Sequence, residues 1–338
     1  MAFKVALVGM DMASAGVPDW VYSDLEKADI DFAVKMCKTR DELAEVAGDA
    51  DVIWVFGSHE IVYAENLDVL KRCGAIIRSG SGTDNIPVAE ATKLGIIVAN
   101  TPEAISDSVA NHAIGLLFAV TRQIAAQDHF TREGKWDRDL AWPNYHFHGQ
   151  TLGLIGFGHI ARLVAHKLSG FDMRMVCYDP FIRPEVMAEL NVQSADLDAL
   201  LKESDFVSVH CPLLPSTHHL INERTLHLMK PTAVLINTSR GPVVDEPALI
   251  RALSEKWIAA AGLDVFEQEP IAPDNPLLKL SNIVVTPHIA GYSDEFWNNF
   301  WKLSVETAID LSKGQWPRSY VNHDVKPRWS HLVSAPTA

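Results

Sequence analysis

Short apolar segments alternate with segments of helical periodicity along most of the chain. In the first hundred residues, apolar runs of strand length occupy residues 4–8, 31–34, 52–56, 75–77 and 96–99. Between them, residues 41–47 and 66–72 repeat their apolar positions as one face of a helix does. Strands that alternate with helices are typical of parallel sheets with crossover connections. The pattern therefore predicts a small doubly wound α/β domain.

A long helical pattern separates this region from a second series of strands. Ser106 and Asp107 are good N-cap residues, so we expect the helix to begin near them. Its apolar face is formed by Val109, Ala113, Leu117, Val120 and Ile124. Further strands are expected at residues 152–155, 173–178, 206–209, 233–237, 258–263 and 283–285. These strands, with helices between them, make a second doubly wound domain.

A glycine-rich turn follows the first strand of this second series. Gly156 permits a tight turn, Gly158 lets the backbone approach a ligand, and the small Ala161 lets helix and strand pack closely. The amides at the start of the next helix, at His159 and Ile160, can hold a diphosphate, because the helix dipole also favours negative charge there. The spacing predicts a dinucleotide-binding site.

Asp179 ends the next predicted strand, 23 positions after Gly156. A carboxylate at an offset of roughly 20 residues hydrogen-bonds the ribose hydroxyls of a bound dinucleotide. The same carboxylate repels a 2′-phosphate, so the sequence favours NAD over NADP.

The last helical pattern, residues 295–311, has no obvious packing partner in the second domain. We therefore expect the chain to return to the first domain. Residues 1–102 and 292–338 would then form a flavodoxin-like, substrate-binding domain, with residues 103–291 inserted as an NAD-binding domain of Rossmann type. The expected class is α/β with two doubly wound parallel sheets. The aromatic residues expected at a domain or subunit contact, or in a pocket wall, are Phe296, Trp297, Phe300 and Trp301.

Composition and charge exclude several kinds of partner. The chain has 338 residues, of which 29 are basic and 43 acidic, giving a net charge of −14. Such a chain repels a polyphosphate backbone, so nucleic acid is not an expected partner. The first apolar run is too short for a signal peptide or a membrane span, so no membrane association is expected. Four dispersed cysteines without a C-x-x-C pair are typical of reduced thiols in a cytoplasmic protein.

Histidines gather at two places, but neither place has the spacing of a metal site. One group is His218, His219 and His227, and the other is His146 and His148. No cysteine or carboxylate set accompanies them, so solvated loops are the expected explanation and no metal is predicted.

Charged residues follow three strands of the second domain. Arg240 comes after the strand at 233–237, Glu269 after that at 258–263, and His288 after that at 283–285. The carboxyl ends of parallel strands line the ligand crevice of an open α/β sheet, so these side chains are expected to converge on the nucleotide. Each residue by itself is more often structural, and their combination is what indicates a site.

Nearly the whole chain, from about residue 52 to residue 291, resembles the D-isomer-specific 2-hydroxyacid dehydrogenases, the family that includes glycerate, D-lactate and 3-phosphoglycerate dehydrogenases. The matching runs are G-S-G-T-D-N-I at 80–86, N-T-P at 100–102, the glycine turn with Y-D-P at 178–180, N-T-S-R-G at 237–241, G-L-D-V-F with E-P at 262–270, and T-P-H at 286–288. So many matches in one order are far more specific than any of them alone.

The resemblance implies that Arg240, Glu269 and His288 are the catalytic residues. The flat guanidinium of Arg240 can bond both the carboxylate and the carbonyl of a 2-oxo acid. His288 can give a proton to the carbonyl oxygen during reduction and take it back during oxidation. Glu269 can orient the imidazole and favour its protonated form.

The resemblance also implies which residues bind ligands. The backbone amides of Ser79, Gly80 and Ser81 resemble the family's carboxylate-binding loop, which would hold the substrate together with Arg240. Asp264 would face the nicotinamide side of the cofactor. Besides the glycine turn and Asp179, the other residues implied to line the cofactor are Pro212, Thr217, Thr238 and Ser239.

The implied activity is that of an NAD-dependent D-2-hydroxyacid dehydrogenase, or 2-oxo acid reductase, which transfers a hydride between NAD(H) and C2 of a small acid. The family also implies a homodimer, with the irregular stretch around Trp136, Trp142 and Tyr145 at its contact. Glu269 disfavours formate dehydrogenase, a relative with glutamine at that position.

Two alternatives to this activity stay open on the residues alone. Phosphite dehydrogenase has the same three catalytic residue types. Residues 77–86 also resemble the C-terminal binding proteins, which are NAD-responsive co-repressors.

Three positions depart from the commonest family pattern. His159 stands where arginine is frequent, Ala161 replaces a third glycine, and Asn111 stands where glutamate is usual. Backbone contacts to a diphosphate do not depend on these side chains, whereas a local ion pair from position 111 is not expected here.

Overall fold

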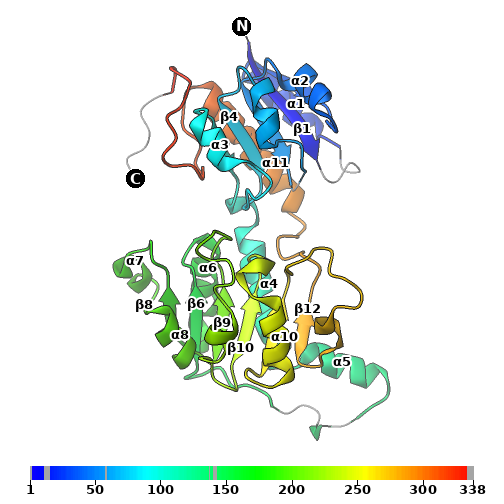
Figure 1. Ribbon diagram of the computed structural model, residues 1–338, viewed down its shortest axis with the longest axis vertical. Coiled ribbons are helices and arrows are strands. Elements are labelled where there is room, and N and C mark those ends of the chain that lie inside the picture. The colour runs from blue at the N-terminus through cyan, green and yellow to red at the C-terminus, as the bar shows by residue number, and fades with distance from the viewer. Residues whose placement is uncertain (1, 11–15, 58, 137, 140–142, 333–338) are drawn as a thin grey trace. The chain divides into compact units, whose positions relative to one another are not determined.

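The computed structural model describes residues 2–10, 16–57, 59–136, 138–139 and 143–332 (Figure 1). The chain forms two compact units. Unit 1 consists of Met1–Ile105 and Asp294–Ala338, and unit 2 of Ser106–Ser293. The two changes of unit lie within three residues of the boundaries that the sequence analysis expects.

Unit 1 contains a parallel sheet in the order β2-β1-β3-β4-β5. Its strands are β1 Phe3–Met10, β2 Ile30–Val34, β3 Val52–Phe56, β4 Ala75–Ser79 and β5 Ile97–Asn100. This is the flavodoxin-like strand order. The apolar runs are continuous because helices cover both faces of the sheet.

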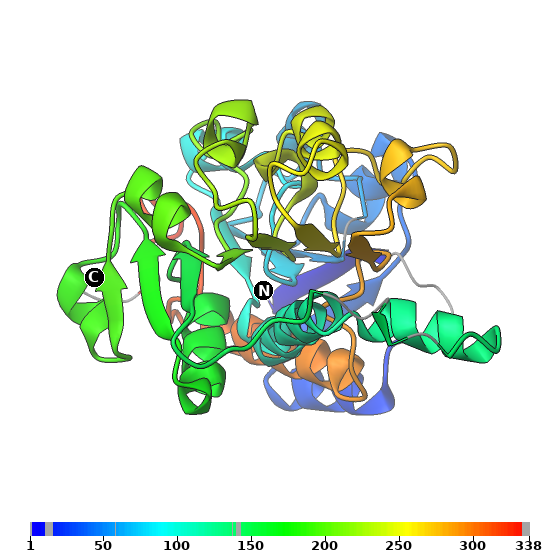
Figure 2. The ribbon, with the colours of Figure 1, turned by 90° about the horizontal axis from the view of Figure 1, so that it is seen from below.

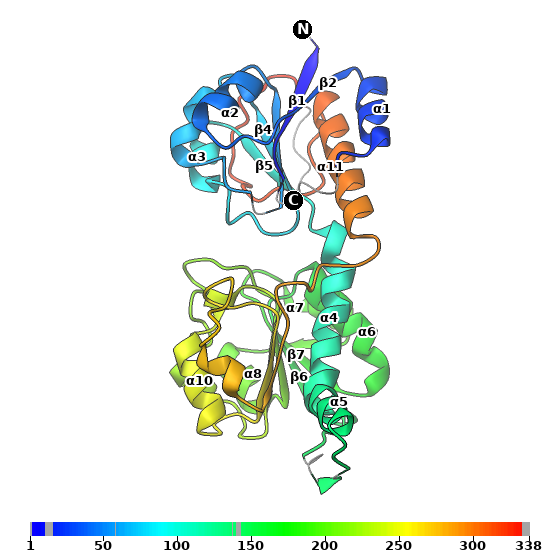
Figure 3. The same cartoon turned by 90° about the vertical axis from the view of Figure 1, so that its right-hand side faces the viewer.

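The helices of unit 1 form one layer on each face of the sheet (Figure 3). α2 (Arg40–Ala47) and α3 (Val88–Lys93) pack on the face that presents Ile53, Val55 and Ile76. α1 (Asp19–Lys27) and α11 (Phe296–Ser312) pack on the face that presents Leu7, Trp54 and Ile77. The C-terminal helix is therefore part of the core of unit 1.

The aromatic residues of α11 pack inside unit 1. Trp301 lies 5.3 Å from Trp54 between ring centroids, and Trp297 stacks on Phe56 at 5.4 Å. These contacts make the cluster an internal part of one core, which corrects the expectation that it packs between domains or subunits.

Two local expectations for unit 1 were wrong or incomplete. The segment at 66–72 is not an α-helix: the chain forms a 3₁₀ helix, η1, over Ala64–Val69. The side chain of Asn66 donates to the carbonyl of Ile61, and this local bond favours the tighter turn. Helices α1 and α3 were not predicted.

Unit 2 contains a parallel sheet of seven strands in the order β12-β11-β10-β9-β6-β7-β8. Its strands are β6 Thr151–Ile155, β7 Arg174–Tyr178, β8 Val192–Ser194, β9 Phe206–Val209, β10 Val234–Asn237, β11 Ala260–Leu263 and β12 Ile283–Val285. The order reverses between β6 and β9, as in a Rossmann fold, which confirms the predicted class. The short β8 was missed because only Val192 of its three residues is buried.

Helical layers lie on both sides of this sheet (Figure 2). One layer holds α4 (Glu103–Thr121) and α6 (His159–Leu168). The other holds α8 (Leu197–Glu203), α9 (Glu223–Leu226) and α10 (Glu246–Ser254). The remaining helical segments are α5 Ile124–Arg132, α7 Pro184–Ala188, η3 Ser169–Phe171, η4 Gly241–Val243 and η5 Pro276–Lys279.

Helix α4 differs from its prediction at both ends. It begins at Glu103, so Ser106 and Asp107 lie inside its first turns and are not its N-caps. It ends before Gln123, whose left-handed backbone, at φ +52°, separates it from α5. Ile124 therefore leaves the apolar face and is 56% exposed.

By length and composition alone, α4 is apolar enough to cross a bilayer. Half of its apolar window is buried, with Ala110, Ala113 and Leu117 inside the core of unit 2. Packing against the sheet accounts for its composition.

Lys256 provides a test of backbone strain in unit 2. It is exposed and follows α10 with φ +62°, in the left-handed region that favours glycine. Lys256→Gly should stabilise the protein by about 1 kcal/mol, raising the temperature of thermal unfolding by about 2–4 °C. Glu255→Gly, at φ −90°, is the matched control and should lower that temperature. Equal effects of the two substitutions would contradict the strain argument.

Candidate active site

The glycine turn lies where the strand order of unit 2 reverses. Gly156 has φ +91°, and a Cβ atom on it would stand 2.8 Å from the backbone nitrogen of Cys211, just after β9. The Gly156 amide donates to the carbonyl of Tyr178 at 2.8 Å. Only glycine fits this position, because both its backbone conformation and the space around it exclude a side chain.

The start of α6 fits the diphosphate of a dinucleotide. Gly158 is the N-cap residue and is exposed, and a Cβ atom on it would meet nothing within 4 Å. The amides of His159 and Ile160 belong to the first turn, where the helix supplies no acceptor. A phosphate can therefore approach these donors over the bare Cα of Gly158.

Asp179 fixes the same turn from the end of β7. Its Oδ2 accepts from the amide of Phe157 at 2.8 Å, and its Oδ1 accepts from that of Phe181 at 2.9 Å. Oδ1 also accepts from the amide of Ile182 at 3.3 Å. The carboxylate is partly exposed, and Oδ2 keeps a second lone pair for a ribose hydroxyl. Its hold on the glycine turn is a function that the sequence analysis did not assign.

Thr238, directly after β10, carries an unsatisfied polar atom. The residue is 7% exposed, and its buried Oγ1 has no hydrogen-bond partner in the described part of the chain. Such an atom in a native protein points to a missing partner such as a ligand. Together with the turn at Gly158, it shows that the carboxyl edge of this sheet fits NAD.

Thr217 and Pro212 belong to one closed turn beyond β9. The Thr217 hydroxyl donates to the carbonyl of Pro212 at 2.6 Å and accepts from the amide of Leu214 at 2.7 Å. The Thr217 side chain thus shapes the loop, while Pro212 is exposed at its start.

Asn237 shapes the loop that presents Arg240. Its Oδ1 accepts from the amide of Ser239 at 3.0 Å, and its Nδ2 donates to the carbonyl of Arg240 at 3.0 Å. A Cβ atom on Gly241 would lie 1.8 Å from the carbonyl oxygen of Phe266. The absence of that atom lets the arginine loop lie directly on the segment that leads to Glu269.

His288 and Glu269 form a close pair. The imidazole Nδ1 lies 2.5 Å from the Glu269 Oε2, and Oε1 of the same carboxylate accepts from the amide of Phe266 at 3.0 Å. The His288 ring is 48% exposed, and its Nε2 has no partner in the part of the chain that the structure describes. A nitrogen held on one side and open on the other is suited to proton exchange with a ligand.

The surroundings of Glu269 keep it ionised. Burial by itself would raise the pKa of this carboxyl, but the hydrogen bonds from His288 and the Phe266 amide and the charges of His288 and Arg240 outweigh it, so the pKa is lowered. A lowered pKa stabilises the fold above the ordinary pKa of glutamate, and this stabilisation is lost as the pH falls through the lowered value. At neutral pH Glu269 is an anion facing His288 and near Arg240.

Asp264 holds the backbone around His288. It is fully buried, and it accepts from the Thr286 hydroxyl at 2.6 Å and from the amides of Ile289 and Ala290 at 2.9 and 2.8 Å. The His288 amide donates to the carbonyl of Asp264 at 2.8 Å. Both carboxylate oxygens thus accept from protein donors, so Asp264 orients this backbone. The cofactor contact that the resemblance implies stays a prediction.

His112 is a residue of this site that the sequence analysis missed. Its Nε2 lies 2.9 Å from the Thr286 hydroxyl and 3.6 Å from Asp264. Because Thr286 donates its proton to Asp264, it accepts from His112, whose Nε2 therefore carries hydrogen. The signal lay in the S-V-A-N-H-A run, where Asn111 instead donates to Asp107 on the surface of α4.

The histidine groups outside this site show no metal geometry. His218 stacks on His219, and His227 contacts Trp257 in a tilted geometry, both with ring centroids 3.9 Å apart. Across the described residues, no group of histidine, cysteine and acidic side chains could hold a metal ion.

The loop after β4 in unit 1 differs from the expected carboxylate-binding loop. The Gly80 amide donates to the Thr101 hydroxyl at 2.8 Å, and the Ser79 hydroxyl is buried against Trp54 and Ser304. Gly80 is therefore not available as a donor to a ligand. The amides of Ser81 and Gly82 have no acceptor among the residues described, so these two amides are the candidate donors to a ligand.

Comparisons with known proteins agree with this architecture. Residues 114–290 match the family described as D-isomer specific 2-hydroxyacid dehydrogenase, NAD binding domain. The chain is 45% identical over 267 residues to the glyoxylate reductase of Korarchaeum cryptofilum, covering 78% of this chain and 80% of that protein. It is 43% identical over 293 residues to that of Thermofilum pendens, covering 85% and 86%.

A solved structure has a similar fold. The D-lactate dehydrogenase of Aquifex aeolicus, in complex with NAD and lactic acid, aligns with a TM-score of 0.78 and 30% identity, over 92% of this chain and 96% of that one. The chain therefore belongs to the D-isomer-specific 2-hydroxyacid dehydrogenase family, and it is an NAD-dependent oxidoreductase that interconverts 2-hydroxy and 2-oxo acids.

Proposed function

We propose that the protein reduces a small 2-oxo acid with NADH, with glyoxylate as the first candidate, and oxidises the corresponding 2-hydroxy acid in reverse. The observation that carries this proposal is the pair of His288 and Glu269, 2.5 Å apart, with Arg240 close enough to lower the pKa of the carboxyl. The glyoxylate reductases of Korarchaeum and Thermofilum support the choice of substrate.

His288 would act as the acid and base of this reaction. Its Nδ1 faces Glu269, so Nε2 is the atom that gives a proton to the carbonyl oxygen or removes it from the hydroxyl. The hydrogen bond to Glu269 fixes the orientation of the imidazole ring. NAD(H), when bound, accepts or supplies the hydride at C2 of the acid.

Arg240 would orient the substrate and polarise its carbonyl. A guanidinium offers two parallel N–H groups to a carboxylate and keeps its charge at any working pH. Asn237 holds the backbone of this residue. The positive charge of Arg240 also balances the developing negative charge on the carbonyl oxygen.

Unit 1 would bind the substrate carboxylate and unit 2 the cofactor. We assign the carboxylate to the amides of Ser81 and Gly82 in place of those of Ser79 and Gly80. In unit 2, the first turn of α6, Asp179 and the unsatisfied hydroxyl of Thr238 would contact NAD.

We also propose a cellular location and an oligomeric state. A cytoplasmic location is supported by four buried cysteines without disulfides, and burial raises the pKa of Cys73 and Cys211 to about 12, which keeps them protonated. A homodimer is supported by α5, none of whose residues is buried, and by Trp136, which is 80% exposed. Tyr145 packs on Phe206 inside unit 2, and Trp142 lies outside the described residues.

Substitution of the proposed acid and base tests the activity directly. His288→Ala and Arg240→Ala should each lower the rate of glyoxylate reduction by about 10²–10⁴-fold, because each removes a group used in the transition state. NADH binding, measured by fluorescence titration, should stay within about twofold of the wild type. His218→Ala, an exposed histidine, is the matched control. Full activity of His288→Ala would refute the proposed mechanism.

Asp179 is expected to set the choice between NAD and NADP. Asp179→Asn keeps an oxygen acceptor for the Phe157 amide but removes the charge that repels a 2′-phosphate. The ratio of kcat/KM with NADH to that with NADPH should fall by about tenfold, the equivalent of about 1.4 kcal/mol. Glu185→Gln on α7 removes the same charge elsewhere in unit 2 and should leave the ratio alone. An unchanged ratio for Asp179→Asn speaks against a ribose contact.

The homodimer is tested by the mass in solution. Light scattering should give twice the mass of one chain, and Trp136→Glu should shift the population towards the monomer, because a charge opposes burial of that surface. Phe181→Glu, which alters another aromatic residue that is 80% exposed, should leave the mass unchanged. A monomeric wild type, or equal effects of the two substitutions, excludes this contact.

A further inference from the structure

We propose that Asn100 and Thr101, from the N-T-P run that begins at the last residue of β5, are positioning residues for the substrate loop. We define the substrate loop as residues 79–82. The inference rests on the proposed function, since it concerns the amides of Ser81 and Gly82 that would bind the substrate carboxylate. It also gives a role to the C-terminal segment, which we define as residues 296–332 and which contributes Ser304 and Ser319.

Three hydrogen bonds tie the loop to this dipeptide. The Thr101 amide donates to the carbonyl of Gly80 at 3.0 Å, and the Thr101 hydroxyl accepts from the Gly80 amide at 2.8 Å. The Asn100 Nδ2 donates to the carbonyl of Ser81 at 2.7 Å. Two successive carbonyls of the loop, those of Gly80 and Ser81, are therefore held by neighbouring residues.

Peptide planarity turns this anchoring into an orientation. In a trans peptide unit the N–H group points opposite to the C=O group. Because the Gly80 carbonyl faces Thr101, the Ser81 N–H points away from it. The Ser81 carbonyl faces Asn100, so the Gly82 N–H points away as well. The loop thereby presents two successive donors on its opposite side, as an anion-binding nest does.

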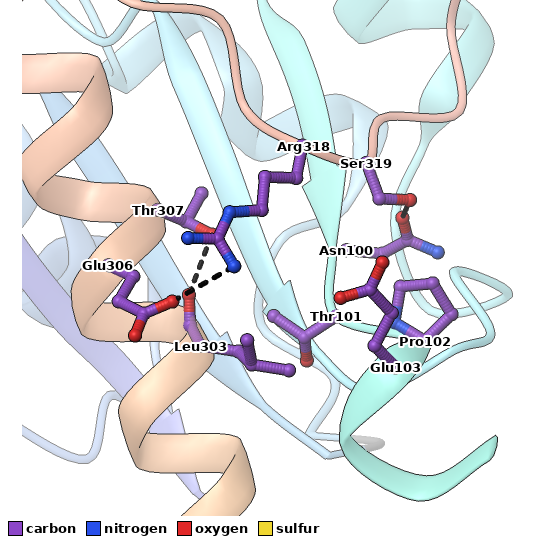
Figure 4. A pocket seen from close by; sticks show the side chains of 9 residues that line it. All are labelled: Asn100, Thr101, Pro102, Glu103, Leu303, Glu306, Thr307, Arg318 and Ser319. Carbon is purple, nitrogen blue, oxygen red and sulfur yellow. Dashed lines mark hydrogen bonds and ion pairs between the residues drawn. The ribbon is translucent and has the colours of Figure 1, made fainter. Parts of the chain in front are cut away.

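Asn100 is itself fixed by the C-terminal segment (Figure 4). The Ser319 hydroxyl donates to the Asn100 Oδ1 at 2.6 Å, and the backbone N–H of Asn100 donates to the Ser319 carbonyl at 3.3 Å. The side chain of Asn100 cannot be reversed, because the Ser81 carbonyl accepts only and must face Nδ2. Since Asn100 is only 7% exposed, water cannot easily replace these partners.

The first residue of the loop has a second anchor from the C-terminal segment. The Trp54 Nε1 donates to the Ser79 hydroxyl at 2.7 Å, and that hydroxyl lies 2.8 Å from the Ser304 hydroxyl on α11. Trp54 can only donate, so Ser79 accepts from it and shares a further hydrogen bond with Ser304. Ser79 and Ser304 are completely buried. The loop is thus held at Ser79, Gly80 and Ser81, and the amides of Ser81 and Gly82 remain for a ligand.

Asn100→Asp tests the orientation with little change of shape. The substitution removes the donor to the Ser81 carbonyl and places an acceptor against it, which repels the carbonyl and turns the Gly82 amide. KM for glyoxylate should rise by about tenfold to a hundredfold, as expected for loss of a hydrogen bond to a charged ligand. The dissociation constant of NADH, which does not involve this loop, should change by less than about twofold.

Asn322→Asp is the matched control, in the C-terminal segment that also contains Ser319. Asn322 is 3% exposed, and its side chain bonds to Ile96, Thr92 and Val98: Nδ2 donates to the carbonyl of Ile96 at 2.9 Å and to the Thr92 hydroxyl at 3.0 Å, and Oδ1 accepts from the Val98 amide at 2.9 Å. This substitution should lower the unfolding temperature but leave KM unchanged. An unchanged KM in Asn100→Asp, or an equal rise in Asn322→Asp, overturns the proposal.

Hydrogen exchange gives a readout that does not depend on the variant folding. In the wild-type protein with NADH, addition of oxamate, an inert analogue of a 2-oxo acid, should slow exchange at the amides of Ser81 and Gly82. Exchange at the Gly80 amide, already bonded to Thr101, should change much less. The reverse pattern contradicts the inference. A wild type that reduces no 2-oxo acid refutes instead the proposed function, so the two failures are distinguishable.

Discussion

The buried carboxylate of Asp264 is the interaction on which the geometry of the active site depends. It is completely buried, and its oxygens accept from the Thr286 hydroxyl and from the amides of Ile289 and Ala290. Loss of a hydrogen-bond partner by a buried polar group costs about 1–3 kcal/mol, so this chain segment has few alternatives. It holds His288 at φ +52°, a conformation that a residue with a side chain rarely adopts.

The backbone fixed in this way determines the electrostatics of the site. With its position set, the His288 ring meets Glu269 at 2.5 Å, and the carboxyl keeps a lowered pKa despite burial. The pair leaves Nε2 as the outward nitrogen. His112 extends the same network to α4, so the helix that begins the nucleotide-binding unit also contributes to the loop of the proposed acid and base.

Unit 1 uses the same physical device with uncharged groups. Its substrate loop is held from behind by Asn100 and Thr101, while Ser319 holds Asn100. In both units a loop at the carboxyl end of a sheet is oriented through hydrogen bonds on its protein side. The ligand side is left with donors and acceptors that have no other partner, such as the Thr238 hydroxyl. This explains why the N-T-P run, which contacts the substrate loop, occurs beside the loop that we propose binds the substrate.

Local patterns in the chain were enough to predict the class of fold, the glycine turn and the set of charged strand ends, because periodicity and the conformational limits of glycine are local properties. It also selected Arg240, Glu269 and His288 as candidates, although their proximity was only an expectation. Tertiary structure decided the rest. That Gly80 gives its amide to Thr101, that Asp264 serves the backbone, and that His112 joins Thr286 all depend on contacts between segments far apart in the chain. Such contacts leave no periodic signal, because they are set by how the sheets bring strand ends together.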